Sequence, residues 1–207
     1  MSLKVKFFNN TREPKGLLGQ IMIIRMNRHH KSLVSWALSN FPKDEKKDIL
    51  EIGCGGGKNA LELLKTYKNA HLTAVDYSPV SIKNSKKVLR HAIKDGKCEV
   101  LEQNVLNLTL EKERYDLITA FETVYFWKDL NVAFKNVLDC LKPGGQFIIT
   151  HENDGCIDNV EKLESMIDGL RLYKFEEMRD ALLSVGFSTV TMIHHDINPW
   201  IMVFATK

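Results

Sequence analysis

Apolar residues along this 207-residue chain change their spacing repeatedly, and the changes predict an alternation of strands and helices. Short apolar runs, typical of strands buried on both faces of a sheet, alternate with segments whose apolar residues recur at helical spacing. The predicted strands are 49–52, 71–75, 98–101, 115–121 and 146–150, and the predicted helices are 58–67, 79–95 and 130–141. This order indicates a parallel sheet covered by helices on both faces, with ligands beyond the carboxyl ends of the strands.

The C-terminal part of the chain departs from this alternation. A polar stretch precedes a predicted helix at 174–185. Two segments rich in β-branched or aromatic residues, 189–194 and 200–205, then flank a turn signal and predict a hairpin. The expected fold is therefore α/β: a doubly wound, mostly parallel, seven-stranded Rossmann-like sheet that ends in an antiparallel hairpin.

The N-terminal part predicts a separate feature. Residues 17–41 have the apolar spacing of a helix, and Pro42 ends it. Residues 1–45 are therefore expected to form an N-terminal helical extension, and residues 46–207 the main domain.

Composition agrees with such a fold. Hydrophobic residues make up 44% of the chain and charged residues 27%, as in ordinary globular proteins. No apolar run could span a bilayer and no leader pattern opens the chain, so a cytoplasmic location is expected. The four cysteines form no C-x-x-C pair and the seven histidines no H-E-x-x-H arrangement, so neither disulfides nor a metal site are indicated.

The net charge of +3 is unevenly distributed. Residues 1–31 carry seven Lys or Arg against one Glu, so the remainder is acidic. A second basic run, within 83–97, lies in a predicted helix and is interpreted as its solvated face. Because stacking aromatic residues are not interleaved with these cations, the sequence argues against a nucleic-acid partner. The oligomeric state stays open.

The segment 48–58 carries the strongest chemical signal. A strand containing Glu51 is followed by Gly53, Gly55 and Gly57, and then by a helix. Glycines lack a Cβ, so they allow a sharp turn and the close approach of a ligand. A dinucleotide fingerprint G-x-G-x-x-G would need its third glycine at position 58, which is lysine, whereas the pattern here is G-x-G-x-G. An ordinary glycine turn is the alternative interpretation.

Together with Glu51, this loop resembles the first motif of class I S-adenosylmethionine-dependent methyltransferases. Further motifs of that family follow in order and cover about residues 48–205: Asp76-Tyr77, Asn104-Val105, Tyr115–Phe121 and Leu141–Phe147. The resemblance implies S-adenosyl-L-methionine as the cofactor and a small molecule as the methyl acceptor.

The resemblance also implies a role for each residue at the cofactor. The loop glycines would line its methionine and ribose parts, and Glu51 would fix the loop or reach the amino group through water. Asp76 would hold the ribose, because an ionised carboxylate is a pure acceptor and both vicinal hydroxyls can donate to it. Tyr77 would lie beside the adenine. Capping of the next helix is the structural alternative for Asp76.

At two positions the family pattern is weaker. Asn104 and Val105 would contact the adenine, although many relatives have Asp-Ala there and an amide can donate as well as accept. Phe121 and Glu122 would flank the methyl group and open onto the substrate. The alternatives are a turn residue for Asn104 and a core residue for Phe121.

Methyl transfer from a sulfonium is an in-line displacement, so the protein mainly has to position the reactants in a dry pocket. A hydroxyl or ammonium acceptor also needs a base, and the candidates are Glu122, His151 and His30. His30 would take part only if the N-terminal helix forms a lid. Tyr125 and Trp127 are expected to form an aromatic wall for the acceptor, with anchoring of their loop to the core as the alternative.

We therefore expect transfer to an O or N atom of a small molecule. The sequence lacks the Asn-Pro-Pro-Tyr-like signature of base-modifying amino-methyltransferases and shows no acidic metal site of the catechol type. The alternatives are a catalytically silent cofactor-binding regulatory module and an RNA-directed methyltransferase. A nicotinamide-dependent oxidoreductase is a further alternative, which Lys58 and the turn at 141–147 argue against.

Overall fold

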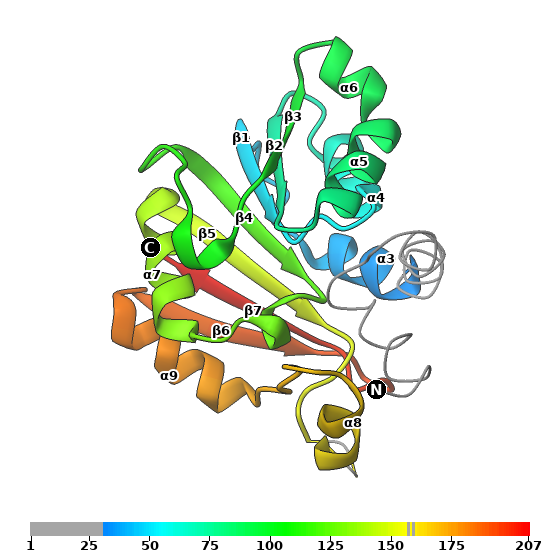
Figure 1. Cartoon of the computed structure of the whole chain (residues 1–207). Coiled ribbons are helices and arrows are strands. Elements are labelled where there is room, and N and C mark those ends of the chain that lie inside the picture. Colours follow the sequence, from blue (N-terminus) through cyan, green and yellow to red (C-terminus); the bar gives the residue numbers. More distant parts are fainter. Residues whose placement is uncertain (1–30, 157, 159) are drawn as a thin grey trace.

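The computed structural model describes residues 31–156, 158 and 160–207, and it contains a seven-stranded sheet (Figure 1). The strand order is β3-β2-β1-β4-β5-β7-β6, in which β1 to β5 are parallel and β7 lies antiparallel between β5 and β6. The strands are β1 (Asp48–Ile52), β2 (His71–Asp76), β3 (Cys98–Glu102), β4 (Tyr115–Phe121), β5 (Leu141–His151), β6 (Thr189–His194) and β7 (Ile201–Thr206). The predicted fold class is confirmed.

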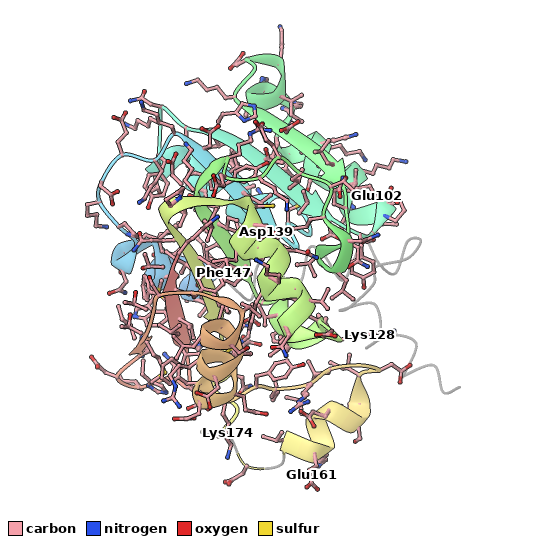
Figure 2. The ribbon with its side chains drawn as sticks, turned by 90° about the vertical axis from the view of Figure 1, so that its left-hand side faces the viewer. Glu102, Lys128, Asp139, Phe147, Glu161 and Lys174 are labelled. Carbon is pink, nitrogen blue, oxygen red and sulfur yellow. The ribbon has the colours of Figure 1, made fainter. Side chains whose placement is uncertain are left out.

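Helices cover both faces of this sheet (Figure 1). One face packs against α3 (Lys31–Asn40), α4 (Lys58–Thr66) and α5 (Pro79–Val88), and the other against α7 (Leu130–Cys140) and α9 (Phe175–Val185). Two short helices, α6 (Arg90–Lys94) and α8 (Val160–Met166), and the 3₁₀ turns η1 (Val105–Asn107) and η2 (Val124–Phe126) complete the described elements. Figure 2 shows α7 and α9 in front of the sheet, with Phe147 of β5 behind them.

The two apolar clusters follow from the alternation of side chains along each strand. On β1, Ile49 joins the cluster under α3, α4 and α5, whereas Leu50 joins the cluster under α7 and α9. Strands that are buried on both faces therefore appear in the sequence as continuous apolar runs. This is why the strand positions could be predicted closely.

Two predicted elements differ in detail. The helix expected at 79–95 is divided at Leu89, whose ψ of 7° interrupts it while the side chain stays buried. The turn expected at 142–145 lies within β5, where the pairing with β4 shifts register between Tyr115 and Leu117. Periodicity does not reveal the break at Leu89, because the apolar spacing continues through it. At 142–145 the Lys-Pro-Gly-Gly run does interrupt the apolar pattern, yet it forms an irregular part of β5.

The end of the expected N-terminal helix belongs to the same core as the sheet. Helix α3 buries Val34 and Ala37, and Phe41 just after it stacks on Phe121 of β4, with ring centroids 5.9 Å apart. The predicted helix begins at residue 17. Its first part, and with it the expected lid, lies outside the described residues. So does His30.

The loop between β1 and α4 is held by backbone contacts that leave no room for side chains. Gly53 N and Cys54 N both donate to Val75 O of β2, at 2.8 and 3.0 Å. Gly53 and Gly57 each have φ of +76°, a conformation that favours glycine. A Cβ on Gly53 would lie 2.5 Å from Thr123 Oγ1, and one on Gly57 would lie 2.9 Å from Ser85 Cα. Gly53 and Gly57 are thus required by both conformation and packing, whereas Gly55 is required by its φ of +51° alone.

The contact with Ser85 gives a prediction that separates these two requirements. Gly96 also has a positive φ, of +69°, but a Cβ there would meet nothing within 4 Å. We expect Gly96→Ala to lower the free energy of unfolding by about 1–2 kcal/mol, the cost of the left-handed conformation. Gly57→Ala should lose a further ~1–3 kcal/mol, because the Ser85 backbone must move. Urea unfolding measures both, and equal losses would exclude the packing requirement.

Candidate active site

A cleft of about 210 Å³ opens at the carboxyl ends of the central strands. Several residues singled out from the sequence line it, and they come from β2 and from the loops that follow β1, β3 and β4. The described lining residues are Ile52, Gly53, Asp76, Tyr77, Gln103, Asn104, Val105, Leu106, Thr123, Phe126, Trp127 and Lys128. Lys128, which is labelled in Figure 2, lies just before α7 and is one of these lining residues.

Asp76 connects the glycine loop to the start of α5. Its carboxylate accepts from Gly55 N at 2.9 Å and from Ser78 N at 2.8 Å, and only 8% of the residue is exposed. Burial raises the pKa of Asp76, while these two backbone hydrogen bonds act in the opposite direction. Asp76 therefore both organises the backbone and presents an acceptor to the cleft. The capping role and the ligand-binding role do not exclude each other.

Glu51 lies close to the loop but does not line the cleft. It is fully buried, and neither carboxylate oxygen has a hydrogen-bond partner. Burial, and then the charge of Asp76, raise its pKa to about 8 from an ordinary 4.5. Of the loop glycines, Gly53 lines the cleft, while Gly55 and Gly57 hold the loop through Asp76 and Ser85.

The residues after β3 form another part of the wall. Asn104 Oδ1 accepts from Leu106 N at 3.0 Å and thereby caps η1. Asn104 and Val105 both line the cleft, and no hydrogen bond among the described residues uses the Asn104 amide nitrogen. Asn104 is therefore a turn residue that also faces the cleft, and its nitrogen is the group left to contact a ligand.

Phe121 is placed differently from the expectation. It is 4% exposed, packs in the cluster under α3 and stacks on Phe41, so it is not among the residues that line the cleft. The side chain of Phe121 points to that face because neighbouring strand residues alternate between the two faces of the sheet. Thr123, two residues further along, provides the cleft wall instead.

Trp127 packs against the core and also reaches the cleft. Its ring stacks on Phe147 at 6.3 Å and meets the edge of Phe134 at 5.9 Å, which anchors the loop after β4 to the core. The same residue also lines the cleft. Tyr125 does not line the cleft, and it belongs to a neighbouring polar cluster.

That cluster comprises Glu122, Tyr125, His151 and Glu152, which follow β4 and end β5. Glu122 accepts from the Tyr125 hydroxyl at 3.0 Å and from the backbone N–H of Glu152. It has φ of +54°, a strained conformation for a residue with a side chain, and strain of this kind is often found at functional sites. Burial, followed by the Glu152 charge, raises the pKa of Glu122 to about 8.

His151 lies against the same cluster. Its ring centroid is 5.1 Å from that of Tyr125, and its Nε2 has no hydrogen-bond partner among the described residues. Burial lowers the pKa of His151 to about 3, so the imidazole is neutral near pH 7. The cluster thus holds a carboxyl group that titrates near neutrality beside a neutral imidazole. His30 cannot be placed relative to it.

Sequence reasoning missed several residues of this region, above all Thr123 and Ser85. Ser85 Oγ donates to Gly55 O at 2.9 Å and supports the loop from α5. A signal for Ser85 existed: Ser78, Ser81 and Ser85 recur at helical spacing on one face, and all three are buried. Thr123 had no comparable signal, because its position depends on the backbone turn at Glu122.

The cleft fits a nucleoside cofactor on its own geometry. Glycine backbone forms one wall, Asp76 offers an acceptor, and a buried carboxyl without a partner lies beside the loop. Among the described residues, no three His, Cys, Asp or Glu side chains are grouped so that they could hold a metal ion. Within the same residues, no helix is long and apolar enough to cross a bilayer.

Known proteins with similar sequences and structures agree with this geometry. A family model described as "Methyltransferase domain" matches residues 50–149. The uncharacterized methyltransferase YdaC of Bacillus subtilis is 23% identical, with 87% of this chain and 93% of that protein covered. The malonyl-[acyl-carrier protein] O-methyltransferase of Priestia megaterium is 27% identical over 70% of this chain, which spans only 56% of that relative.

A SAM-dependent methyltransferase from Aquifex aeolicus has the same fold, with a TM-score of 0.73 at 16% identity over 89% of this chain and 96% of that one. The family model over residues 50–149, these relatives and the shared fold support the assignment of the chain to the class I S-adenosylmethionine-dependent methyltransferases.

Proposed function

We propose that this S-adenosylmethionine-dependent methyltransferase transfers its methyl group to an oxygen or nitrogen atom of a small molecule. The observation that carries the proposal is the buried cluster of Glu122, Tyr125 and His151, which adjoins the cofactor cleft through the loop that contains Thr123. A buried site of this kind suits a small acceptor better than a polymer. O-methyltransferases among the relatives also support it, although the chain spans only 56–59% of two of them.

We assign the cofactor to the cleft that Asp76 lines. The Asp76 carboxylate would accept from the ribose hydroxyls, and Gly53 would allow the ligand to approach the backbone. Tyr77, Asn104 and Val105 would contact the adenine. When bound, the cofactor supplies an electrophilic methyl group on its sulfonium. The protein's task is to hold the acceptor in line with that group and to exclude water.

We assign the removal of the acceptor's proton to Glu122. Its carboxylate is held by Tyr125 and by the Glu152 backbone, so a proton would be taken up at a fixed position. A pKa of about 8 suits a base that works near neutral pH. His151 is the second candidate, and as a neutral imidazole it could accept a proton.

We also propose several further features that the sequence predicts. These are the division of the chain into an extension at 1–45 and a domain at 46–207, the lid, the cytoplasmic location and an acceptor wall that includes Tyr125 and Trp127. The RNA-directed alternative would use the basic run on α5 and α6. The cations of this run are exposed, but they lie on α5, on α6 and in the turn after α6, away from the cluster of Glu122, Tyr125, His151 and Glu152. They are Lys83, Lys86, Lys87, Arg90, Lys94 and Lys97.

The role of Asp76 is tested by cofactor binding. We expect Asp76→Asn to weaken S-adenosylhomocysteine binding about 10- to 100-fold, because a charge-assisted acceptor worth ~1.5–3 kcal/mol is lost. Isothermal titration calorimetry measures the affinity, and the exposed Asp95→Asn serves as the matched control. A thermal melt of each variant checks folding. Unchanged affinity would remove Asp76 from the site, and binding of NADH alone would exclude the methyltransferase assignment.

The role of Glu122 is tested by turnover. With a labelled methyl donor and a panel of phenols, carboxylic acids and amines, we expect Glu122→Gln to lower kcat by about 10²–10⁴-fold, with cofactor affinity kept. The wild-type rate should rise as pH passes about 8, because Glu122 acts only after losing its proton. Tyr125→Phe should have a smaller effect, since the carboxylate remains.

Two outcomes would contradict this assignment. An unchanged kcat in Glu122→Gln would exclude Glu122 as the base. Cofactor binding without transfer to any acceptor of the panel would favour the silent binding module, and transfer only to RNA would favour the RNA-directed enzyme.

A further inference from the structure

Glu51 is buried in a way that its role in shaping the loop does not explain. Its residue exposure is 0%, and both carboxylate oxygens lack a hydrogen-bond partner in the part of the chain that the structure describes. Thr119 is its neighbour on β4, in register with it, and the buried Thr119 Oγ1 also lacks a partner. Buried polar groups without partners are rare in folded proteins and require an explanation. A charged carboxylate in this position would be strongly disfavoured.

The position of Glu51 relates it to the cofactor cleft. It lies two residues before Gly53 and on the sheet edge where Asp76 ends β2, and both of these residues line the cleft. The charges of Glu51 and Asp76 both act on the buried thiol of Cys54 in the loop between them. Two acidic groups are therefore gathered under the glycine loop, where their ionised forms would be favoured by a positively charged ligand.

Charged groups on the surrounding elements do not offset the charge that Glu51 would carry when ionised. Cys98 on β3 is the other titratable group close to Glu51. Helices α3, α4 and α5 cover this face, and they carry their cations on the outer surface at Lys31, Lys58, Lys65, Lys83, Lys86 and Lys87. No described cation is thus placed to pair with Glu51 from inside the protein.

We propose that Glu51 is a proton-linked counter-ion of the cofactor: it is a neutral acid in the cofactor-free protein and releases its proton when the positively charged cofactor binds. The O–H bond of the Glu51 carboxyl breaks, the proton passes to the solvent, and the carboxylate that remains offsets the charge of the ligand. Attraction between opposite charges is strong in a poorly solvated interior, so the ligand changes the protonation of the group. The inference rests on the assignment of the cofactor to this cleft.

The pKa of Glu51 agrees with this assignment. Burial and Asp76 raise it to about 8, so the free protein is protonated at Glu51 at pH 7. An unfolded chain would lose this proton above the ordinary pKa of 4.5. The folded state then binds more protons than the unfolded state between these values, so the stability that Glu51 contributes falls as pH rises from 4.5 to about 8.

The experiment is calorimetric titration of the full chain with S-adenosylmethionine at pH 7 in phosphate and in Tris, whose ionisation enthalpies differ. We expect the apparent binding enthalpy to depend on the buffer and to show close to one proton released per ligand. The release should diminish above pH 8. It should vanish in Glu51→Gln and persist in Glu102→Gln, a matched change at an exposed site on β3 (Figure 2).

A parallel titration with S-adenosylhomocysteine identifies the charge that Glu51 senses. Release with both ligands assigns the effect to the ammonium group that they share, and release with S-adenosylmethionine alone assigns it to the sulfonium. Both results support the proposal. Binding heat without proton release, or equal release in Glu51→Gln, would overturn it. The absence of binding heat with either ligand would instead overturn the cofactor assignment.

A second measurement does not depend on binding by the variant. Glu122 is also protonated at pH 7, so the infrared carbonyl band of Glu51 is isolated as the difference between wild type and Glu51→Gln. This difference band should be present in the free protein at pH 7 and disappear when S-adenosylmethionine is added. Urea unfolding should show that wild type loses stability relative to Glu51→Gln as pH rises from 5 to 9. A difference in stability that does not change with pH would contradict a protonated Glu51.

Discussion

The carboxylate of Asp76 holds together the part of the molecule on which the rest of the site depends. One oxygen fixes Gly55 of the loop after β1, and the other fixes Ser78 at the start of α5. Ser85 of the same helix then bonds to the loop from the other side. Two segments that are distant in sequence, the glycine loop and the stretch from Asp76 to Ser85, are therefore fixed to one another at the carboxyl edge of the sheet. The cleft exists because these contacts hold its backbone wall in place.

Sequence reasoning worked where a residue's role depends on local pattern. The strands were found because burial on both faces gives continuous apolar runs, and the loop was found because glycine spacing reflects its backbone conformation. Local pattern says less about residues whose placement depends on distant contacts. Phe121 ends a strand beside the cleft, but its side chain packs in the core, where it stacks on Phe41 just after α3. Thr123 takes its place because of the unusual backbone at Glu122, which no spacing reveals.

The site contains two buried acids with similar titration but different surroundings. Glu51 and Glu122 both have pKa values raised to about 8, mainly by burial. Glu122 is held by hydrogen bonds from Tyr125 and Glu152, which suits a group that must keep a fixed position. Glu51 has no such bonds, and its state can therefore respond to the charge of a ligand. Burial thus has a similar effect on the pKa of both acids, but we propose different roles for them. Glu122 is a base held in position, and Glu51 is a group that responds to the charge of the ligand.

The close packing of Gly57 against Ser85 has a consequence for how the enzyme can change over generations. The loop and α5 meet through backbone and small side chains, so almost any substitution on that side disturbs both. The segment after β4 is different, because it is anchored by the Trp127 ring while Tyr125 and Phe126 lie outside the fully buried core. The fold therefore tolerates an exchange of side chains at Tyr125 more readily than one in the glycine loop, so sequence variation is expected to accumulate first in the segment after β4.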